Sequence, residues 1–164
     1  MNPRVCKKPS DENQLPNITL DCVDGGSISL WDFRDRNNVV IFFFDPSSKS
    51  DIYTLRMFGM RDLEFADANA EVIAIADDPD VASIDKMKSI GVPFHILIDY
   101  GSVARSKLSI EYVPSVAVFD RYGMLLMTCI ECTSVDAVLE DIIAELESAE
   151  MQSHDGVVSS LRMN

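Results

Sequence analysis

The chain has 164 residues, of which 47% are hydrophobic, and its formal net charge at pH 7 is −13. This length and composition suit one globular domain with a sizeable core and exclude a disordered chain. An acidic surface repels phosphate backbones, so DNA or RNA is not expected as a partner. No apolar run reaches the ~18 residues that a membrane-spanning helix needs, so a membrane partner is not expected either.

The first third of the chain predicts an arm followed by strands. Residues 1–14 are polar and show no periodicity, which indicates an arm. Apolar and polar residues alternate loosely over residues 15–23, and the Asp-Gly-Gly sequence at 24–26 predicts a turn. The alternation of residues 27–30, with a period of two, predicts a short strand. The continuous β-branched and aromatic run 39–44 is typical of a central strand that is buried on both faces.

Helices and strands then alternate. Residues 50–69 predict a helix that Gly59 weakens. Its apolar face is expected to comprise Ile52, Leu55, Phe58 and Leu63. Residues 71–76 predict a second buried strand, after which Asp78 is expected to cap a helix that starts with Pro79. The apolar face of that helix is expected to comprise Val81, Ile84 and Met87.

The last third predicts a third strand at residues 94–98, a short helix at 102–108 and a hairpin. The hairpin strands are residues 115–119 and 124–130, and Gly123 suits the positive φ of the turn between them. The cleanest amphipathic helix starts near residue 135. Its apolar positions are Val135, Val138, Leu139, Ile142, Ile143 and Leu146. Residues 150–164 turn polar and predict a tail, which leaves residues 15–149 as one domain.

This order of elements predicts an α/β fold with a mostly parallel sheet. Several segments also resemble, in order, motifs of the thioredoxin-fold superfamily in its peroxiredoxin-like form, the alkyl hydroperoxide reductase and thiol-specific antioxidant group. The similar segments are residues 15–20, 29–34, 39–44, 71–77, 91–94, 103–105, 112–115 and 119–123. The resemblance implies a three-layer α/β/α fold with a mixed sheet that ends in an antiparallel hairpin and a C-terminal helix.

The chain departs from this family where its chemistry resides. The family's peroxidatic motif P-x-x-x-[ST]-x-x-C, aligned from Pro46, places Ser50 at the hydroxyl position and Tyr53 at the cysteine. In the C-x-x-C register of thioredoxins, Ser48 and Asp51 replace the two cysteines. Peroxide reduction needs a thiolate nucleophile, which a hydroxyl cannot replace. We therefore expect negligible peroxidase activity at this corner. The family's arginine is also missing from the strand that follows Pro114, where Arg105 and Arg121 are the nearest candidates.

Two further features of the corner remain open. Ser47, Ser48 and Ser50 surround the expected start of a helix, where backbone N–H groups can bind a small anion or where a serine can simply cap the helix. Pro114 matches the family's cis-proline, so the resemblance implies a cis peptide bond here.

The remaining candidate groups are thiols and histidines. Cys129 and Cys132 form a C-x-x-C motif. We expect ordinary strand-end cysteines rather than a working dithiol, because in an extended strand their Cα atoms would lie roughly 10 Å apart, beyond the ~7 Å limit of a disulfide. A turn at Glu131 would allow the dithiol alternative. Cys6 and Cys22 are expected to be incidental thiols, and His95 a core residue. No metal site or cofactor is expected. Four cysteines do not make a disulfide framework, and residues 1–8 contain no apolar signal segment, so we expect a cytoplasmic protein.

The sequence thus leaves three hypotheses. The preferred hypothesis is a non-catalytic binding or assembly module that binds a protein partner or a second copy of itself. A thiol-disulfide oxidoreductase using Cys129 and Cys132 is the first alternative, and a small-anion binder at the Ser48 corner is the second.

Overall fold

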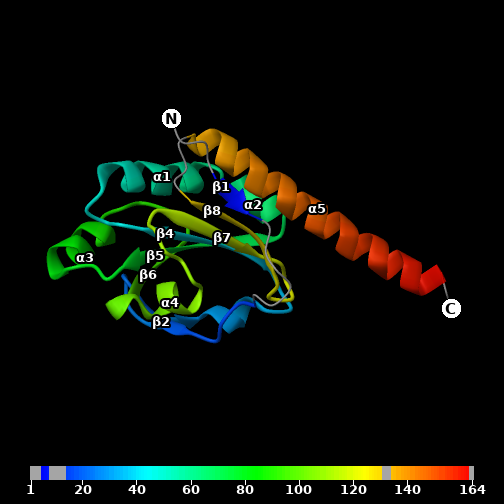
Figure 1. Ribbon diagram of the computed structural model, residues 1–164, viewed down its shortest axis with the longest axis horizontal. Coiled ribbons are helices and arrows are strands. Elements are labelled where there is room, and N and C mark those ends of the chain that lie inside the picture. Colours follow the sequence, from blue (N-terminus) through cyan, green and yellow to red (C-terminus); the bar gives the residue numbers. More distant parts are fainter. Residues whose placement is uncertain (1–4, 8–13, 131–133, 163–164) are drawn as a thin grey trace.

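The computed structural model describes residues 5–7, 14–130 and 134–162. Within these residues the strands form one eight-stranded sheet in the order β1-β8-β7-β4-β5-β6-β2-β3. Helices α1, α2, α3 and α5 pack on one face of the sheet, whereas α4 and η1 pack on the other (Figure 1). The expected three-layer α/β/α arrangement with a mixed sheet and a C-terminal helix is confirmed.

The elements follow the predicted order closely. The strands are β1 Val5–Lys7, β2 Thr19–Cys22, β3 Ser27–Ser29, β4 Asn38–Phe44, β5 Ala70–Asp77, β6 His95–Asp99, β7 Ser115–Phe119 and β8 Leu125–Ile130. The helices are η1 Leu30–Phe33, α1 Lys49–Met60, α2 Asp62–Asp67, α3 Val81–Lys88, η2 Tyr100–Ser102, α4 Val103–Lys107 and α5 Val135–Arg162.

The centre of the sheet explains the longest apolar run of the sequence. Every residue of β4 is buried, because β4 pairs in parallel with β5 on one side and antiparallel with β7 on the other, and helices or loops cover both faces. Strands β5 and β6 are also parallel. The terminal hairpin β7–β8 is antiparallel, as predicted.

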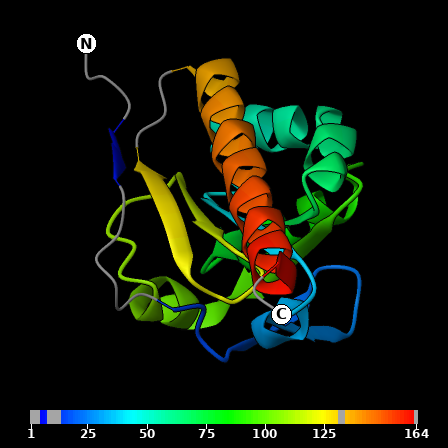
Figure 2. The same ribbon diagram turned by 90° about the vertical axis from the view of Figure 1, so that its right-hand side faces the viewer.

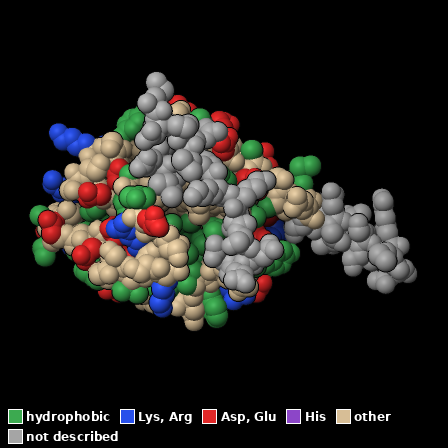
Figure 3. Space-filling view, in the orientation of Figure 1, with side chains coloured by type: hydrophobic (Ala, Val, Ile, Leu, Met, Phe, Trp, Pro, Cys, Tyr) green, Lys and Arg blue, Asp and Glu red, His purple; other side chains and the backbone are tan. Residues whose placement is uncertain are grey.

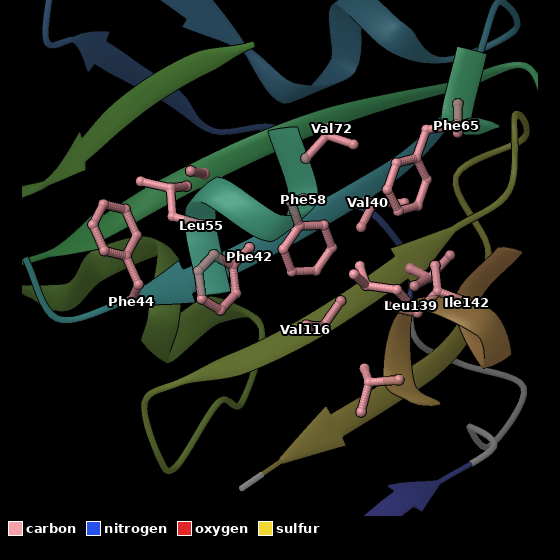
Figure 4. Close-up of a cluster of buried hydrophobic side chains, with 14 of the residues drawn as sticks. Val40, Phe42, Phe44, Leu55, Phe58, Phe65, Val72, Val116, Leu139 and Ile142 are labelled. Atoms are coloured by element: carbon pink, nitrogen blue, oxygen red, sulfur yellow. The ribbon is translucent and has the colours of Figure 1, made fainter. Parts of the chain in front are cut away.

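Alternation along β4 divides the core between the two faces of the sheet. Val40, Phe42 and Phe44 belong to the cluster beneath α1, α2 and α5, whereas Ile41 and Phe43 belong to the cluster on the opposite face. The first cluster contains stacked aromatic rings, seen in Figure 4. The Phe42 and Phe58 ring centroids are 5.1 Å apart, and those of Phe58 and Phe65 are 5.8 Å apart.

The helical segment after β4 differs from the prediction. It breaks at Arg61 into α1 and α2, and the break changes which residues face the sheet. Leu63, which the periodicity assigned to the core, is 79% exposed, and Phe65 is buried instead. Gly59 lies close to the loop before β6, since a Cβ atom there would be 3.2 Å from Cδ of Pro93.

The predicted start of the next helix was also wrong. Asp80, not Asp78, caps α3, and its side chain accepts a hydrogen bond from the backbone N–H of Ser83. Asp78 instead adopts a positive φ of 40°. The predicted face is otherwise confirmed, since Met87 is buried and Ile84 packs against the same cluster, but Val81, now the first residue of the helix, is 77% exposed.

The two ends of the chain contain more regular structure than expected. Residues Val5–Lys7 of the expected arm form β1, which pairs antiparallel with β8 at the edge of the sheet. The last helix does not stop near residue 149 but continues to Arg162, and its C-terminal part projects past the sheet (Figures 1 and 2). Regular backbone therefore extends into both predicted polar ends.

Candidate functional site

The corner between β4 and α1 is built from short-range hydrogen bonds. Ser48 caps α1, and its hydroxyl accepts a hydrogen bond from the backbone N–H of Asp51. The carboxylate of Asp45 accepts from the backbone N–H and the hydroxyl of Ser47 at 2.9 and 2.7 Å. The corner is therefore a capped, internally bonded turn.

Asp51 carries a buried carboxyl group in this corner. Its side chain is buried, and its Oδ2 accepts a hydrogen bond of 2.8 Å from the backbone N–H of Asp45. Burial raises the pKa of the Asp51 carboxyl above its ordinary value, although the hydrogen bonds from Asp45 and Ser48 act in the opposite direction. A carboxyl group thus occupies the start of the helix.

The other predicted corner residues differ in exposure. Pro46 is buried, whereas Ser47 and Ser50 are exposed. The Tyr53 side chain, at the position of the cysteine in the aligned motif, is 59% exposed and points its surface to solvent. None of residues 45–54 contains sulfur.

Pro114 lies against this corner, as the resemblance implied. The Val113–Pro114 peptide bond is cis, which confirms that expectation. Ser115, directly after it, pairs with Phe43 near the end of β4. Pro114 also lines a small apolar hollow with Thr54 of α1 and Val135 of α5. The other residues that line the hollow are Phe42, Phe58, Val116, Val138 and Leu139.

Cys129 lies at the same end of the sheet. It is fully buried on β8, it is opposite Val116 of β7, and its sulfur is engaged in a disulfide. Cys132 lies outside the described residues, so the alternative in which Cys129 and Cys132 act as a dithiol stays a hypothesis. On the other side of β8, the register places Cys6 of β1 directly opposite Cys129.

The two arginines that sequence analysis named lie in structural ion pairs. Arg105 donates to Asp77 at 2.8 Å and to the backbone carbonyls of Ile110 and Glu111. Arg121 pairs with Glu150 of α5. These contacts use both side chains to hold elements together, so neither takes the place of the family's arginine at the corner.

A second group of side chains with metal-ligating atoms was not predicted from the sequence. Cys22, Asp24 and His95 bring a sulfur, a carboxylate oxygen and an imidazole nitrogen within 4.8 Å of one another. His95 is exposed at the start of β6 and is not the core residue that was predicted. The prediction was wrong because His95 is the first residue of β6, and the buried part of this strand begins only at the next residue, Ile96.

The Cys22 group is remote from the corner. Strand β2 is separated from β4 by β6 and β5, which corresponds to roughly 14 Å at ~4.8 Å per strand. Burial, and then the charges of Asp24 and Asp21, raise the pKa of the Cys22 thiol. Cys22 therefore does not supply the missing thiolate of the corner.

The sheet order, the helix after β4 and the cis-proline beside it define a thioredoxin-like protein. The AhpC/TSA family matches residues 12–127, and the chain belongs to that family. Peroxiredoxin Q of rice (Oryza sativa subsp. japonica), a chloroplastic protein, is 34% identical over 105 residues, which cover 63% of this chain and 48% of that protein. The wheat (Triticum aestivum) chloroplastic peroxiredoxin Q is 32% identical over 123 residues, covering 74% and 52%.

The fold is shared with solved structures. The peroxidoxin BcpB of Mycobacterium tuberculosis superposes with a TM-score of 0.73 at 17% identity, covering 84% of this chain and 96% of that one. The chain spans about half the length of the curated relatives that it matches. None of the helices in the described residues combines the length and hydropathy needed to cross a membrane.

Proposed function

We propose that this chain is a peroxiredoxin-fold protein that binds another protein at the β4–α1 corner without catalysing peroxide reduction. The observation that carries the proposal is the chemistry of the corner. Hydroxyls and the Asp51 carboxyl lie where the family's thiolate chemistry requires sulfur. A carboxylate or hydroxyl does not accept the oxygen of a peroxide as a thiolate does.

The anion-binding alternative finds little support in the hydrogen bonds of the corner. Four backbone N–H groups of the corner already donate hydrogen bonds to acceptors within the protein, namely those of Asp45, Ser47, Ser48 and Asp51. An anion at this helix start would also face the Asp51 carboxyl and the Asp45 carboxylate. Phosphate or sulfate is therefore expected to leave the melting temperature unchanged.

The surface offered to a partner combines the apolar hollow with an exposed aromatic ring. The hollow is lined by Thr54, Pro114 and Val135, and Tyr53 precedes Thr54 on α1. Tyr53 is exposed, and tyrosine is a common anchor in protein interfaces. On the face shown in Figure 3, acidic side chains are scattered among polar and hydrophobic ones, so we expect the partner to be a protein rather than a polyanion.

The first test measures peroxide consumption with dithiothreitol and, separately, with a thioredoxin system as reductant. We expect no turnover above the rate of the same thiols free in solution. Turnover that persists after substitution of all four cysteines would show that a group other than sulfur is catalytic and would overturn the proposal. Turnover that disappears in those variants would instead favour the redox alternative.

The second test places a photo-crosslinking amino acid at Tyr53 and, as the control, at Tyr122, which is similarly exposed on the β7–β8 turn. A partner captured at position 53 but not at 122, and lost when Thr54→Arg fills the hollow, supports the proposal. A crosslinked dimer of this chain would identify a second copy as the partner. Equal capture at both positions would contradict a specific surface at the corner.

The disulfide of Cys129 favours a second candidate, a redox-controlled link between β1 and β8. Directly opposed residues of an antiparallel pair have Cα atoms about 4.5–5.5 Å apart, which is within the range that a disulfide spans. Cys6 meets this condition by register, whereas Cys132 follows Cys129 by three residues beyond an extended strand. We therefore favour Cys6 as the partner of Cys129.

Hydrogen peroxide can serve as the oxidant that forms this disulfide. Two thiols lose two protons and two electrons, and one peroxide molecule becomes two water molecules. Peptide mapping before and after a slight excess of peroxide, then after reductant, tests the pairing. A reversible Cys6–Cys129 link supports this candidate, a Cys129–Cys132 link supports the C-x-x-C alternative, and permanently reduced thiols contradict both.

A further inference from the structure

The structure places three side chains with metal-ligating atoms at the end of β2, away from the corner. Cys22 is the last residue of β2, Asp24 lies in the turn that follows, and His95 begins β6. Their sulfur, oxygen and nitrogen atoms all lie within 4.8 Å of one another. We propose that Cys22, Asp24 and His95 bind one zinc ion with three protein ligands and one open position.

The backbone register explains why these three side chains meet. Strand β2 runs antiparallel to β6, with Cys22 opposite Leu97, and the backbone N–H of Val23 donates to the carbonyl of Ile96 at 2.9 Å. Continuing this register places Asp24 opposite His95. Residues two apart on a strand share a face, so Cys22 and Asp24 point to the same side as His95.

The turn that carries Asp24 is tightly defined. The backbone N–H of Cys22 donates to the carbonyl of Gly26 at 2.9 Å, and the N–H of Gly25 donates to the carbonyl of Cys22 at 3.2 Å. Gly25 and Gly26 both have positive φ, which suits glycine. Two of the three ligands are thus held on a short, hydrogen-bonded turn, and the third lies on the adjacent strand.

The set of donor atoms matches zinc. Thiolate, imidazole and carboxylate are its usual protein ligands, at bond lengths of about 2.0–2.3 Å. Tetrahedral geometry at these lengths separates the ligand atoms by roughly 3.3–3.7 Å. Asp24 and His95 are exposed, so small rotations of their side chains would bring all three atoms to that spacing. The soft thiolate disfavours magnesium and calcium, which prefer oxygen ligands.

The charges around the site also favour a dication. With Cys22 bound as a thiolate and Asp24 as a carboxylate, two of the three ligands would be negatively charged. The nearby cation, Lys88, lines the adjoining hollow with Asp24 and His95, but its ammonium group lies 3.6 Å from the carboxylate of Asp85. Zinc binding would release the thiol proton of Cys22 to solvent. Asp24 and His95 are exposed and line this hollow, so water could take the fourth coordination position.

Cobalt(II) titration of the full chain tests the proposal, because Co²⁺ replaces zinc and reports thiolate ligation by a charge-transfer absorption band. We expect one Co²⁺ per chain, displaced by Zn²⁺, and a band that is absent in Cys22→Ser. His95→Ala and Asp24→Asn are expected to weaken binding by at least about tenfold. His95 is exposed, so His95→Ala retains a folded protein even if Cys22→Ser does not.

Asp21→Asn is the matched control, since it removes the same charge from the neighbouring, exposed position on the other face of β2. We expect it to change the affinity by less than about twofold. Absence of a charge-transfer band in the wild-type chain would overturn the proposal. It would also be overturned if His95→Ala bound Co²⁺ as tightly as wild type, or if Asp21→Asn weakened binding as much as Asp24→Asn.

Discussion

The Oδ2 atom of Asp51 accepts a hydrogen bond of 2.8 Å from the backbone N–H of Asp45, which ties the first turn of α1 to the residue after β4. In a thiolate enzyme of this fold, the positive end of the helix dipole stabilises a reactive sulfur. Here the same end faces a buried carboxyl group. The corner is closed by its own hydrogen bonds among Asp45, Ser48 and Asp51.

The raised pKa of Asp51 predicts a specific pH dependence of stability. Because the folded protein holds the Asp51 proton more tightly than the unfolded chain does, the free energy of unfolding falls as pH rises from about 3.9, the ordinary Asp value, through the raised pKa. Asp51→Asn removes this ionisation and keeps an acceptor oxygen. We expect the variant to gain stability relative to wild type over that pH window, measured by urea unfolding.

Asp51→Ala removes both the carboxyl charge and the hydrogen-bond acceptor, so comparison with Asp51→Asn isolates the effect of the hydrogen bond. It leaves the backbone N–H of Asp45 without its acceptor, so we expect a loss of about 1–2 kcal/mol at neutral pH. Asp32→Asn, at an exposed position, serves as the control and is expected to change stability by less than about 0.5 kcal/mol. A wild-type protein that gained stability relative to Asp51→Asn with rising pH would show that the folded state prefers the charged carboxylate.

Asp99 predicts a larger structural effect. Its fully buried carboxylate accepts hydrogen bonds of 2.9 Å from the backbone N–H groups of Ala104 and Arg105, which join the end of β6 to α4. Asp99→Asn keeps the shape but places an amide donor against one of these N–H donors. We expect it to lower the free energy of unfolding by about 1–3 kcal/mol.

Asp78→Asn is the matched control for Asp99→Asn. Asp78 also accepts a backbone hydrogen bond, from Gly101, but this contact is exposed, and asparagine tolerates the positive φ of position 78. We expect a loss of less than about 1 kcal/mol, measured by the same chemical denaturation. If the two variants lost the same free energy of unfolding, burial of Asp99 would not increase the stabilisation that its hydrogen bonds provide.

The strands were predictable because their patterns are local. The run that became β4 contains residues that suit burial on both faces, and the Asp-Gly-Gly turn before β3 requires positive φ, which glycine provides. The phase of the helices was less predictable. The break at Arg61 exposed Leu63 and buried Phe65, and the shift of a cap from Asp78 to Asp80 left Val81 exposed at the helix start; neither has a strong local signal.

The side-chain groups were harder to predict because they depend on pairing between distant strands. Cys22 meets His95 only because β2 lies beside β6, and the backbone of Cys6 lies opposite Cys129 only because a three-residue strand forms in the expected arm. Spacing along the sequence shows neither pairing. The C-x-x-C spacing of Cys129 and Cys132, by contrast, drew attention to a pair of residues that an extended β8 tends to separate.

Glu150 shows the same dependence on distant contacts, since it lies where a polar tail was predicted to begin. Its carboxylate pairs with Arg121 after β7 and accepts a hydrogen bond of 2.9 Å from Asn38, the first residue of β4. Burial acts to raise the pKa of this carboxyl, but the hydrogen bonds and charge of Arg121 and Asn38 outweigh it, so the pKa lies below its ordinary value.

This lowered pKa predicts that Glu150 stabilises the fold at neutral pH. Its contribution is complete above about 4.3, the ordinary Glu value, and is lost as pH falls through the lowered pKa. We expect Glu150→Gln to lower the free energy of unfolding by about 1–3 kcal/mol at pH 7, and by less as the pH approaches the lowered pKa. Glu147→Gln, on the exposed side of α5, is the control. If both variants unfolded at the same denaturant concentration, the last helix would not depend on Glu150 for its attachment to the sheet.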